Sequence, residues 1–129
     1  MLKIKRILSK KGFSLIELMV AVAILAMAIF GIFHAYSAGF MGMADARDRT
    51  VATNYAQEKM EDIRNKSFDK ITDESPANIN ISGIKFERKV DVADEVAGKL
   101  KKVTTEVSWS DRDGNSKYVV IETLIYNND

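Results

Sequence analysis

A single carboxylate, Glu17, interrupts a run of apolar residues near the start of the chain. The run covers residues 13–33, and Glu17 lies only four residues after it begins. A carboxylate in hydrocarbon is costly unless a cation pairs with it. The position therefore indicates either a charge hydrated near a membrane surface and favoured by the positive end of a helix, or an acid that binds a cationic partner.

Cleavage between Gly12 and Phe13 would create such a partner. Gly12 is a small residue directly before the apolar run, and the cut would leave a new α-amino group on Phe13. In an array of helices staggered along their axes, this amine would meet Glu17 of a neighbouring chain. One acid would then serve both processing and assembly, because the pair would set the register between subunits.

A second group of oxygen-bearing side chains lies near the end of the chain. Asp111, Asp113, Asn115 and Glu122 match positions 1, 3, 5 and 12 of an EF-hand calcium loop. Position 6 is Ser116 where the loop requires Gly, and the flanking residues alternate as strands do. We therefore expect a hairpin here, while a looser calcium site at the turn carboxylates Asp111 and Asp113 stays open.

The other reactive residue types do not form a catalytic set. The chain has no Cys, which excludes disulfides and Cys-based zinc or redox sites, and its one histidine is His34, expected to be an interfacial or packing residue. The methionines of the apolar region are expected to pack in a helix: Met19, Met27, Met41 and Met43. We predict no catalytic residue, no metal ligand and no cofactor, and hence a protein that is not an enzyme.

The basic residues are concentrated before the apolar run. Five of the 19 Lys and Arg residues precede it with no acid among them: Lys3, Lys5, Arg6, Lys10 and Lys11. This local charge indicates a flank that orients a membrane segment, and nucleic acid is an unlikely partner. A second cluster at Lys99, Lys101 and Lys102 is expected to be a solvated face; the alternative is a weak patch for DNA or an anionic surface, completed by Trp109 and Tyr118.

Residues 13–33 are long enough to cross a bilayer, since they would form about 31 Å of helix against a hydrocarbon core of about 30 Å. The basic flank predicts a single pass with the N-terminus in the cytoplasm. The run is too long for an ordinary secretory signal. Three domains are therefore expected: a leader at 1–12, a transmembrane helix at 13–37 and a soluble head at 38–129.

The periodicity of the head predicts a helix followed by a sheet. Residues 45–64 carry an apolar stripe at three- and four-residue spacing, made of Val51, Ala52, Tyr55, Ala56, Met60 and Ile63. One helix is expected from Phe13 to about Asn65, with Gly31, Gly39 and Gly42 as points where it bends or loosens. After a polar connection over 67–78, period-two patterns predict one or two strands over 79–92 and further strands at 103–109 and 119–125, the last pair joined by the Asp113-Gly114 turn. The fold class is α+β, a long N-terminal helix packed on a small antiparallel sheet.

The segment KKGFSLIE, residues 10–17, resembles the N-terminal signature of type IV prepilins and of the pseudopilins of type II secretion systems. The resemblance implies that a prepilin peptidase at the inner membrane cuts between Gly12 and Phe13 and that the amine of Phe13 is methylated. It also implies partners: other pilin or pseudopilin subunits, and the inner-membrane assembly platform. The mature subunit would leave the bilayer for a cell-surface pilus or a periplasmic pseudopilus.

The rest of the chain is similar to minor pilins of the type IV pilus modification class and to minor pseudopilin I of type II secretion. The resemblance rests on residues 52–64, 107–115 and 123–126. His34 and Gly31 lie where many major pilins carry a proline, and a disulfide loop is impossible without Cys. We expect a minor pilin that joins, primes or caps a filament. A minor pseudopilin, and a pilus-tip module that binds a ligand, a surface or DNA, remain the alternatives.

Overall fold

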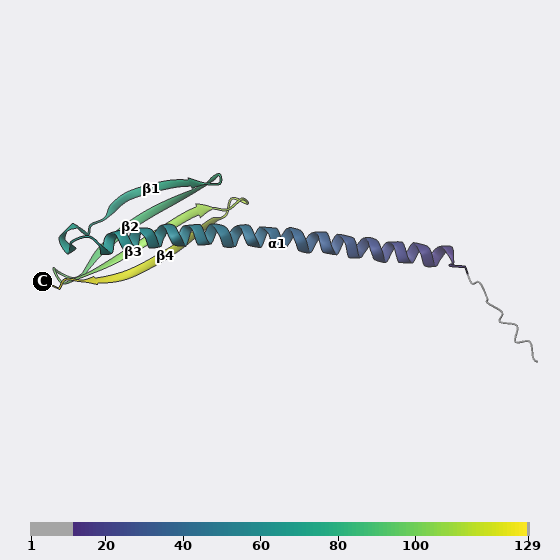
Figure 1. Ribbon diagram of the computed structural model, residues 1–129, viewed down its shortest axis with the longest axis horizontal. Helices are drawn as coiled ribbons and strands as arrows, with labels where there is room; N and C mark the ends of the chain where they lie inside the picture. The colour runs from purple at the N-terminus through teal and green to yellow at the C-terminus, as the bar shows by residue number, and fades with distance from the viewer. Residues whose placement is uncertain (1–11, 129) are drawn as a thin grey trace, which may run out of the picture. The chain divides into compact units, whose positions relative to one another are not determined.

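One long helix and a four-stranded sheet make up the protein in the computed structural model, which describes residues 12–128 (Figure 1). Helix α1 spans Leu15–Arg64, and a short 3-10 helix, η1, spans Phe68–Lys70. The strands are β1 (Glu74–Ile81), β2 (Ile84–Val96), β3 (Leu100–Ser110) and β4 (Ser116–Tyr126). The predicted α+β class is confirmed.

Helix α1 continues through the three glycines at which we expected a bend or a looser turn. Gly31, Gly39 and Gly42 all lie inside its bounds, and no proline occurs before Pro76. Each glycine costs a helix about 1 kcal/mol relative to Ala, which is not enough to end it.

The chain divides into two units, one ending at Met41 and the other beginning at Gly42. The expected boundary between residues 37 and 38 stays a prediction.

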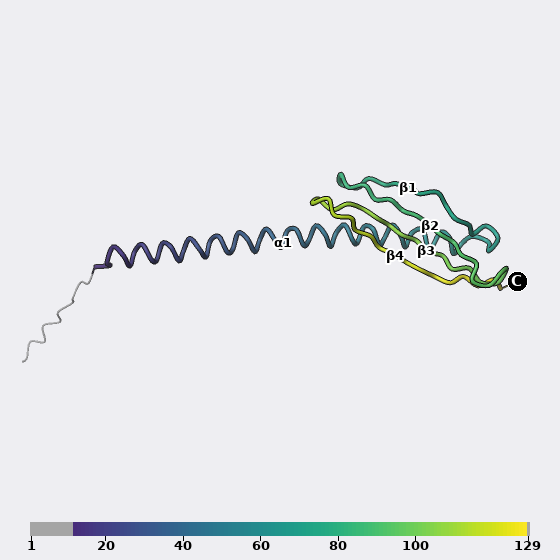
Figure 2. The backbone as a smooth tube through the Cα atoms, turned by 180° about the vertical axis from the view of Figure 1, so that it is seen from behind, coloured from purple at the N-terminus to yellow at the C-terminus, as the bar shows by residue number. Residues whose placement is uncertain are grey.

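The four strands form an antiparallel meander in the order β1-β2-β3-β4, and Figure 2 shows them side by side in that order. Ser82 and Gly83 connect β1 to β2 with positive φ angles of 52° and 83°. The polar connection expected over 67–78 is shorter, because β1 already begins at Glu74. Pro76 lies inside this strand, which an edge strand tolerates, and the register shifts between Glu74 and Ala77.

The second half of α1 and the inner face of the sheet form the core of the head. The predicted apolar stripe is confirmed: Ala52, Ala56, Met60 and Ile63 are buried, and Val51 and Tyr55 are partly buried. Ala52 and Ala56 pack in one cluster with Phe86, Val107 and Trp109, and Met60 and Ile63 pack in another with Ile71, Val90 and Val103. The strands supply these side chains in alternation, as the period-two patterns predict.

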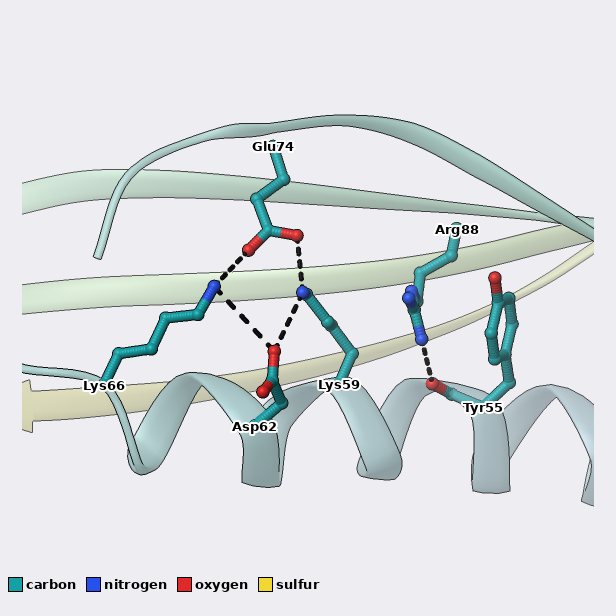
Figure 3. A network of polar contacts seen from close by, with 6 residues as sticks. All are labelled: Tyr55, Lys59, Asp62, Lys66, Glu74 and Arg88. Atoms are coloured by element: carbon teal, nitrogen blue, oxygen red, sulfur yellow. Dashed lines mark hydrogen bonds and ion pairs between the residues drawn. The ribbon is translucent and has the colours of Figure 1, made fainter. Parts of the chain in front are cut away.

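Polar contacts join the last turns of α1 to the strands that follow (Figure 3). Glu74, the first residue of β1, accepts from Lys59 at 2.6 Å and from Lys66 at 2.7 Å. Asp62 accepts from Lys59 at 3.0 Å and lies 3.8 Å from Lys66. We call these four residues the Glu74 network. Beside it, Arg88 of β2 donates to the carbonyl of Tyr55 at 3.1 Å, and its guanidinium carbon lies 4.0 Å from the centre of the Tyr55 ring.

Candidate functional site

The predicted processing junction lies just outside the helix. Gly12, Phe13 and Ser14 precede α1, whose first turn is closed by a hydrogen bond from the Leu18 amide to the Ser14 carbonyl at 3.1 Å. Phe13 is 84% exposed. The Gly12-Phe13 peptide bond is therefore both non-helical and open to solvent, which is the geometry that a peptidase needs in its substrate. The basic leader residues before Gly12 lie outside the described residues.

Glu17 lies in the first turn of α1. Its side chain is exposed, and it makes no hydrogen bond or ion pair with any residue from 12 to 128. The neighbouring Ile16 and Leu18 are also exposed. A carboxylate among apolar side chains, at the positive end of a helix, is thus available to a cation from another molecule.

The first half of α1 exposes its bulky apolar side chains. From Leu15 to Met43 these side chains point away from the helix without burial by other parts of the described chain. By length and composition, this part of α1 can cross a membrane. Tyr36 and Phe40 stack at 6.5 Å, one helical turn apart, near its end. A surface of this kind requires lipid or other helices around it.

His34 lies within this apolar half of α1 and is exposed. Within residues 12–128 it has no hydrogen-bond or ion-pair partner. Its expected role as an interfacial or packing residue stays a prediction.

Strands β3 and β4 form the predicted hairpin, and the EF-hand alternative is wrong because strands and not helices flank the loop. The carboxylate of Asp111 accepts from the amides of Asn115 at 2.8 Å and Asp113 at 3.0 Å, and from the Asn115 side chain at 3.1 Å. The backbone hydrogen bond from Asn115 is the main reason that the pKa of Asp111 lies below its usual value. Gly114, with a φ of 83°, completes the turn.

Glu122, the twelfth residue of the candidate calcium loop, lies far along β4 from this turn. It pairs across the ladder with Thr104 and lies 3.6 Å from Lys102. Among the described residues there is no group of three or more acidic or histidine side chains that could hold a metal. The carboxylate oxygens of Asp111 accept hydrogen bonds from Asp113 and Asn115 within the turn, so the Asp111 carboxylate stabilises the hairpin.

The three lysines of the second basic cluster do not form one patch with Trp109 and Tyr118, so this alternative is wrong. Lys101 turns inward, where its ammonium donates to the carbonyls of Phe68 at 3.0 Å and Ile71 at 2.8 Å. Trp109 is buried in the core against Phe86, with ring centres 5.7 Å apart, and its ring is not available to stack on a base.

A set of exposed side chains on β4 was not predicted from the sequence as a surface. The strand alternates between inner residues that face α1 and outer residues that are also apolar: Tyr118, Val120, Leu124 and Tyr126. The sequence does contain a sign of this surface. Residues 118–121 are four consecutive apolar residues, and in a strand consecutive side chains point to opposite faces, so apolar side chains must lie on both faces. We call these four residues the β4 stripe.

Comparison with known proteins identifies the N-terminal segment. Residues 7–33 match the family described as the prokaryotic N-terminal methylation motif. The match covers the Gly12-Phe13 junction and Glu17, and it ends before the head. No curated protein and no solved structure matches the chain.

Proposed function

We propose that this chain, whose N-terminal motif is that of the type IV prepilin-like proteins, is a minor pilin that joins, primes or caps a type IV pilus. The observation that carries the proposal is Glu17, an exposed acid that has no partner among residues 12–128 and lies in the first turn of a helix whose first half is apolar on all sides. Such a helix is suited to a bundle of similar helices, and its one charge is suited to a cation on a neighbour.

Processing supplies that cation in the proposed sequence of events. A prepilin peptidase cuts the exposed Gly12-Phe13 bond, and the amine of Phe13 is methylated. The methylated amine keeps its positive charge, so it pairs with Glu17 of an adjacent subunit. The assembly platform of the inner membrane then moves the subunit from the bilayer into the filament.

The head is the part that distinguishes this subunit from its neighbours. It is a small four-stranded sheet with no disulfide, built on the second half of α1. The absence of Cys, and so of the disulfide loop common in major pilins, supports a minor subunit. A minor pseudopilin of a type II secretion system would use the same N-terminal steps, so the identity of the neighbouring subunits separates the two.

The test is the substitution Glu17→Leu in a host that makes the other subunits. Membrane insertion and cleavage after Gly12 should persist, because the segment becomes more apolar and the junction is unchanged. Loss of one partner of an ion pair in a low-dielectric setting costs on the order of 3–5 kcal/mol. The processed variant should therefore stay in the inner membrane and be depleted from sheared filaments, and Glu17→Asp should give an intermediate result.

Glu58→Leu is the matched control, because Glu58 is an exposed carboxylate on the same helix but in the head. It should enter filaments like the parent. If Glu17→Leu also enters filaments like the parent, Glu17 is only a hydrated interfacial charge and the proposal fails. Mass spectrometry of the filaments identifies the co-assembled subunits, and type II secretion subunits among them would overturn the assignment to a pilus.

A further inference from the structure

The outer face of β4 carries four exposed apolar side chains in a row. The exposed fractions are 66% for Tyr118, 42% for Val120, 60% for Leu124 and 62% for Tyr126. They occupy four of the five outward positions between residues 118 and 126 of one strand, and Glu122 occupies the fifth, in the middle of the row. A contiguous exposed apolar patch is typical of a protein interface, and tyrosine is enriched among the residues that contribute most to binding.

The rest of the outer face has a different character. On β2 the outward positions are occupied by exposed charged residues of alternating sign: Lys85, Glu87, Lys89 and Asp91. Among residues 12–128, the exposed large apolar side chains of the strands are the four of the β4 stripe and Val96 at the end of β2, so the apolar surface is concentrated on β4. A partner that uses it must lie beside β4, not across the middle of the sheet.

The two edges of the sheet also differ in their backbone. Edge strand β1 contains Pro76 and a register shift, which both hinder pairing with another strand. Edge strand β4 pairs with β3 without a shift from Ser116 to Tyr126 and contains no proline. Within residues 12–128, no backbone hydrogen bond joins β4 to any strand but β3. Its outer edge thus presents a regular row of donors and acceptors that an extended backbone can satisfy.

The charge of Glu122 favours a different protein over a second copy of this chain as the partner of β4. Antiparallel pairing of two β4 strands would align the apolar side chains best when centred on Glu122, with Tyr118 opposite Tyr126 and Val120 opposite Leu124. That register places Glu122 directly opposite its own copy, and like charges in directly opposed positions are destabilising. Lys102 lies 3.6 Å from Glu122, but on the β3 side, so it is not between the two acids.

We infer that β4 pairs edge to edge with a strand of a different filament subunit. The partner strand carries apolar residues on the face that meets the β4 stripe, and a basic or uncharged residue opposite Glu122. This inference rests on the proposed function for the source of the partner, and it adds the surface and the chemistry of the contact. The head would be joined to its neighbour by main-chain hydrogen bonds, independently of the N-terminal helix.

The test uses photochemical crosslinking of the full chain in membranes of a host that makes the other subunits. The natural sequence has no Cys, so Val120→Cys can be labelled at one site with a benzophenone maleimide. The control is Lys89→Cys, which is exposed on the outer face of β2. Val120→Cys should give an adduct with another subunit in clear excess over the control, and mass spectrometry should locate the attachment in a strand of that subunit.

A second variant checks that the apolar stripe is responsible. Leu124→Thr combined with Tyr126→Thr removes two exposed apolar side chains and keeps residues that favour strands. In the Val120→Cys background the adduct should fall about tenfold, while the thermal unfolding of the head stays unchanged. An adduct with a second copy of this chain, attachment to lipid alone, or equal yields at Val120 and Lys89 would overturn the inference.

The two proposals fail in distinguishable ways. If Glu17→Leu enters filaments like the parent while Val120→Cys still crosslinks to another subunit, the proposed role of the N-terminal helix fails and the β4 inference stands. If Glu17→Leu is excluded from filaments but the label gives equal yields at Val120 and Lys89, only the β4 inference fails.

Discussion

The ammonium of Lys59 lies 2.6 Å from the carboxylate of Glu74 and joins the last turns of α1 to the first residue of β1. Lys66 contacts the other oxygen of the same carboxylate at 2.7 Å. Glu74 is therefore held by two lysines of the helix end and the connection after it. This contact and the buried stripe of α1 together make the second half of the helix an integral part of the head.

The head should therefore fold without the apolar half of α1. We expect a fragment of residues 38–129 to be soluble and folded, because it keeps Ala52, Ala56, Met60 and Ile63 over the sheet. A fragment that begins after Arg64 should aggregate, because the inner face of the sheet loses its cover. Circular dichroism and size-exclusion chromatography check both. A stable, monomeric fragment of the sheet alone would show that the helix is not needed in the core.

The stability of this head should fall in acid partly through Glu74. Partial burial opposes ionisation of Glu74, but the hydrogen bonds from Lys59 and Lys66 outweigh it, so the pKa of Glu74 lies below its usual value of 4.5. A lowered pKa in the folded state means that the stabilisation is fully present above the unfolded pKa and is lost as the pH falls through the folded pKa. Urea unfolding of the fragment at pH 7 and at lower pH should show this loss.

Glu74→Gln isolates the contribution of this carboxylate. At pH 7 the variant should lose about 1 to 2 kcal/mol of unfolding free energy, the range for charged hydrogen bonds reduced by partial exposure. The difference from the parent should narrow as the pH falls below 4.5. Asp91→Asn, in the exposed pair with Lys89, is the control and should change little. Equal stability of Glu74→Gln and the parent at pH 7 would show that the network contributes nothing.

Thr105 lies between the two core clusters and offers a stabilising substitution. It is fully buried on β3, and its hydroxyl has no hydrogen-bond partner in the part of the chain that the structure describes. Thr105→Val exchanges the unpaired hydroxyl for a methyl group of similar size, so the unfolding free energy should rise by about 1 kcal/mol. Thr104→Val, on the outer face of the same strand, should change it by less than about 0.5 kcal/mol. A loss of stability in Thr105→Val would mean that the hydroxyl binds a buried water.

The sequence predicted those elements whose periodicity is set by one buried face. The stripe from Ala52 to Ile63 and the alternation in β3 are of this kind, because burial on a single face leaves a clear pattern. Only the end of β1, from Ile79 on, was predicted as a strand. Residues 74–78 were expected to be a connection because they are Pro76 and mostly polar residues, and an edge strand needs less burial. The Glu74 network could not be predicted either: Lys59 and Asp62 show helical spacing, but Glu74 meets them only once the chain has folded back.

The functional residues also fall into a part that the sequence predicts and a part that depends on the fold. Gly12, Phe13 and Glu17 form a local motif that lies within six consecutive residues, so it can be predicted without knowledge of the fold. The β4 stripe depends on which phase of the strand faces α1. Residues 118–121 are apolar in both phases, and only the sheet shows which of them are exposed.

The mature protein should begin at Phe13. The Gly12-Phe13 bond lies outside α1, which starts at Leu15, and both residues are exposed, so a peptidase can bind it in an extended form without unwinding the helix. Mass analysis of the protein from a host with an active prepilin peptidase should show the loss of residues 1–12 and the mass of one added methyl group on Phe13. A host without the peptidase should yield the uncut chain, with its helix still in the membrane. Intact Met1 in the presence of active peptidase would contradict the prediction and would remove the amine that Glu17 is proposed to bind.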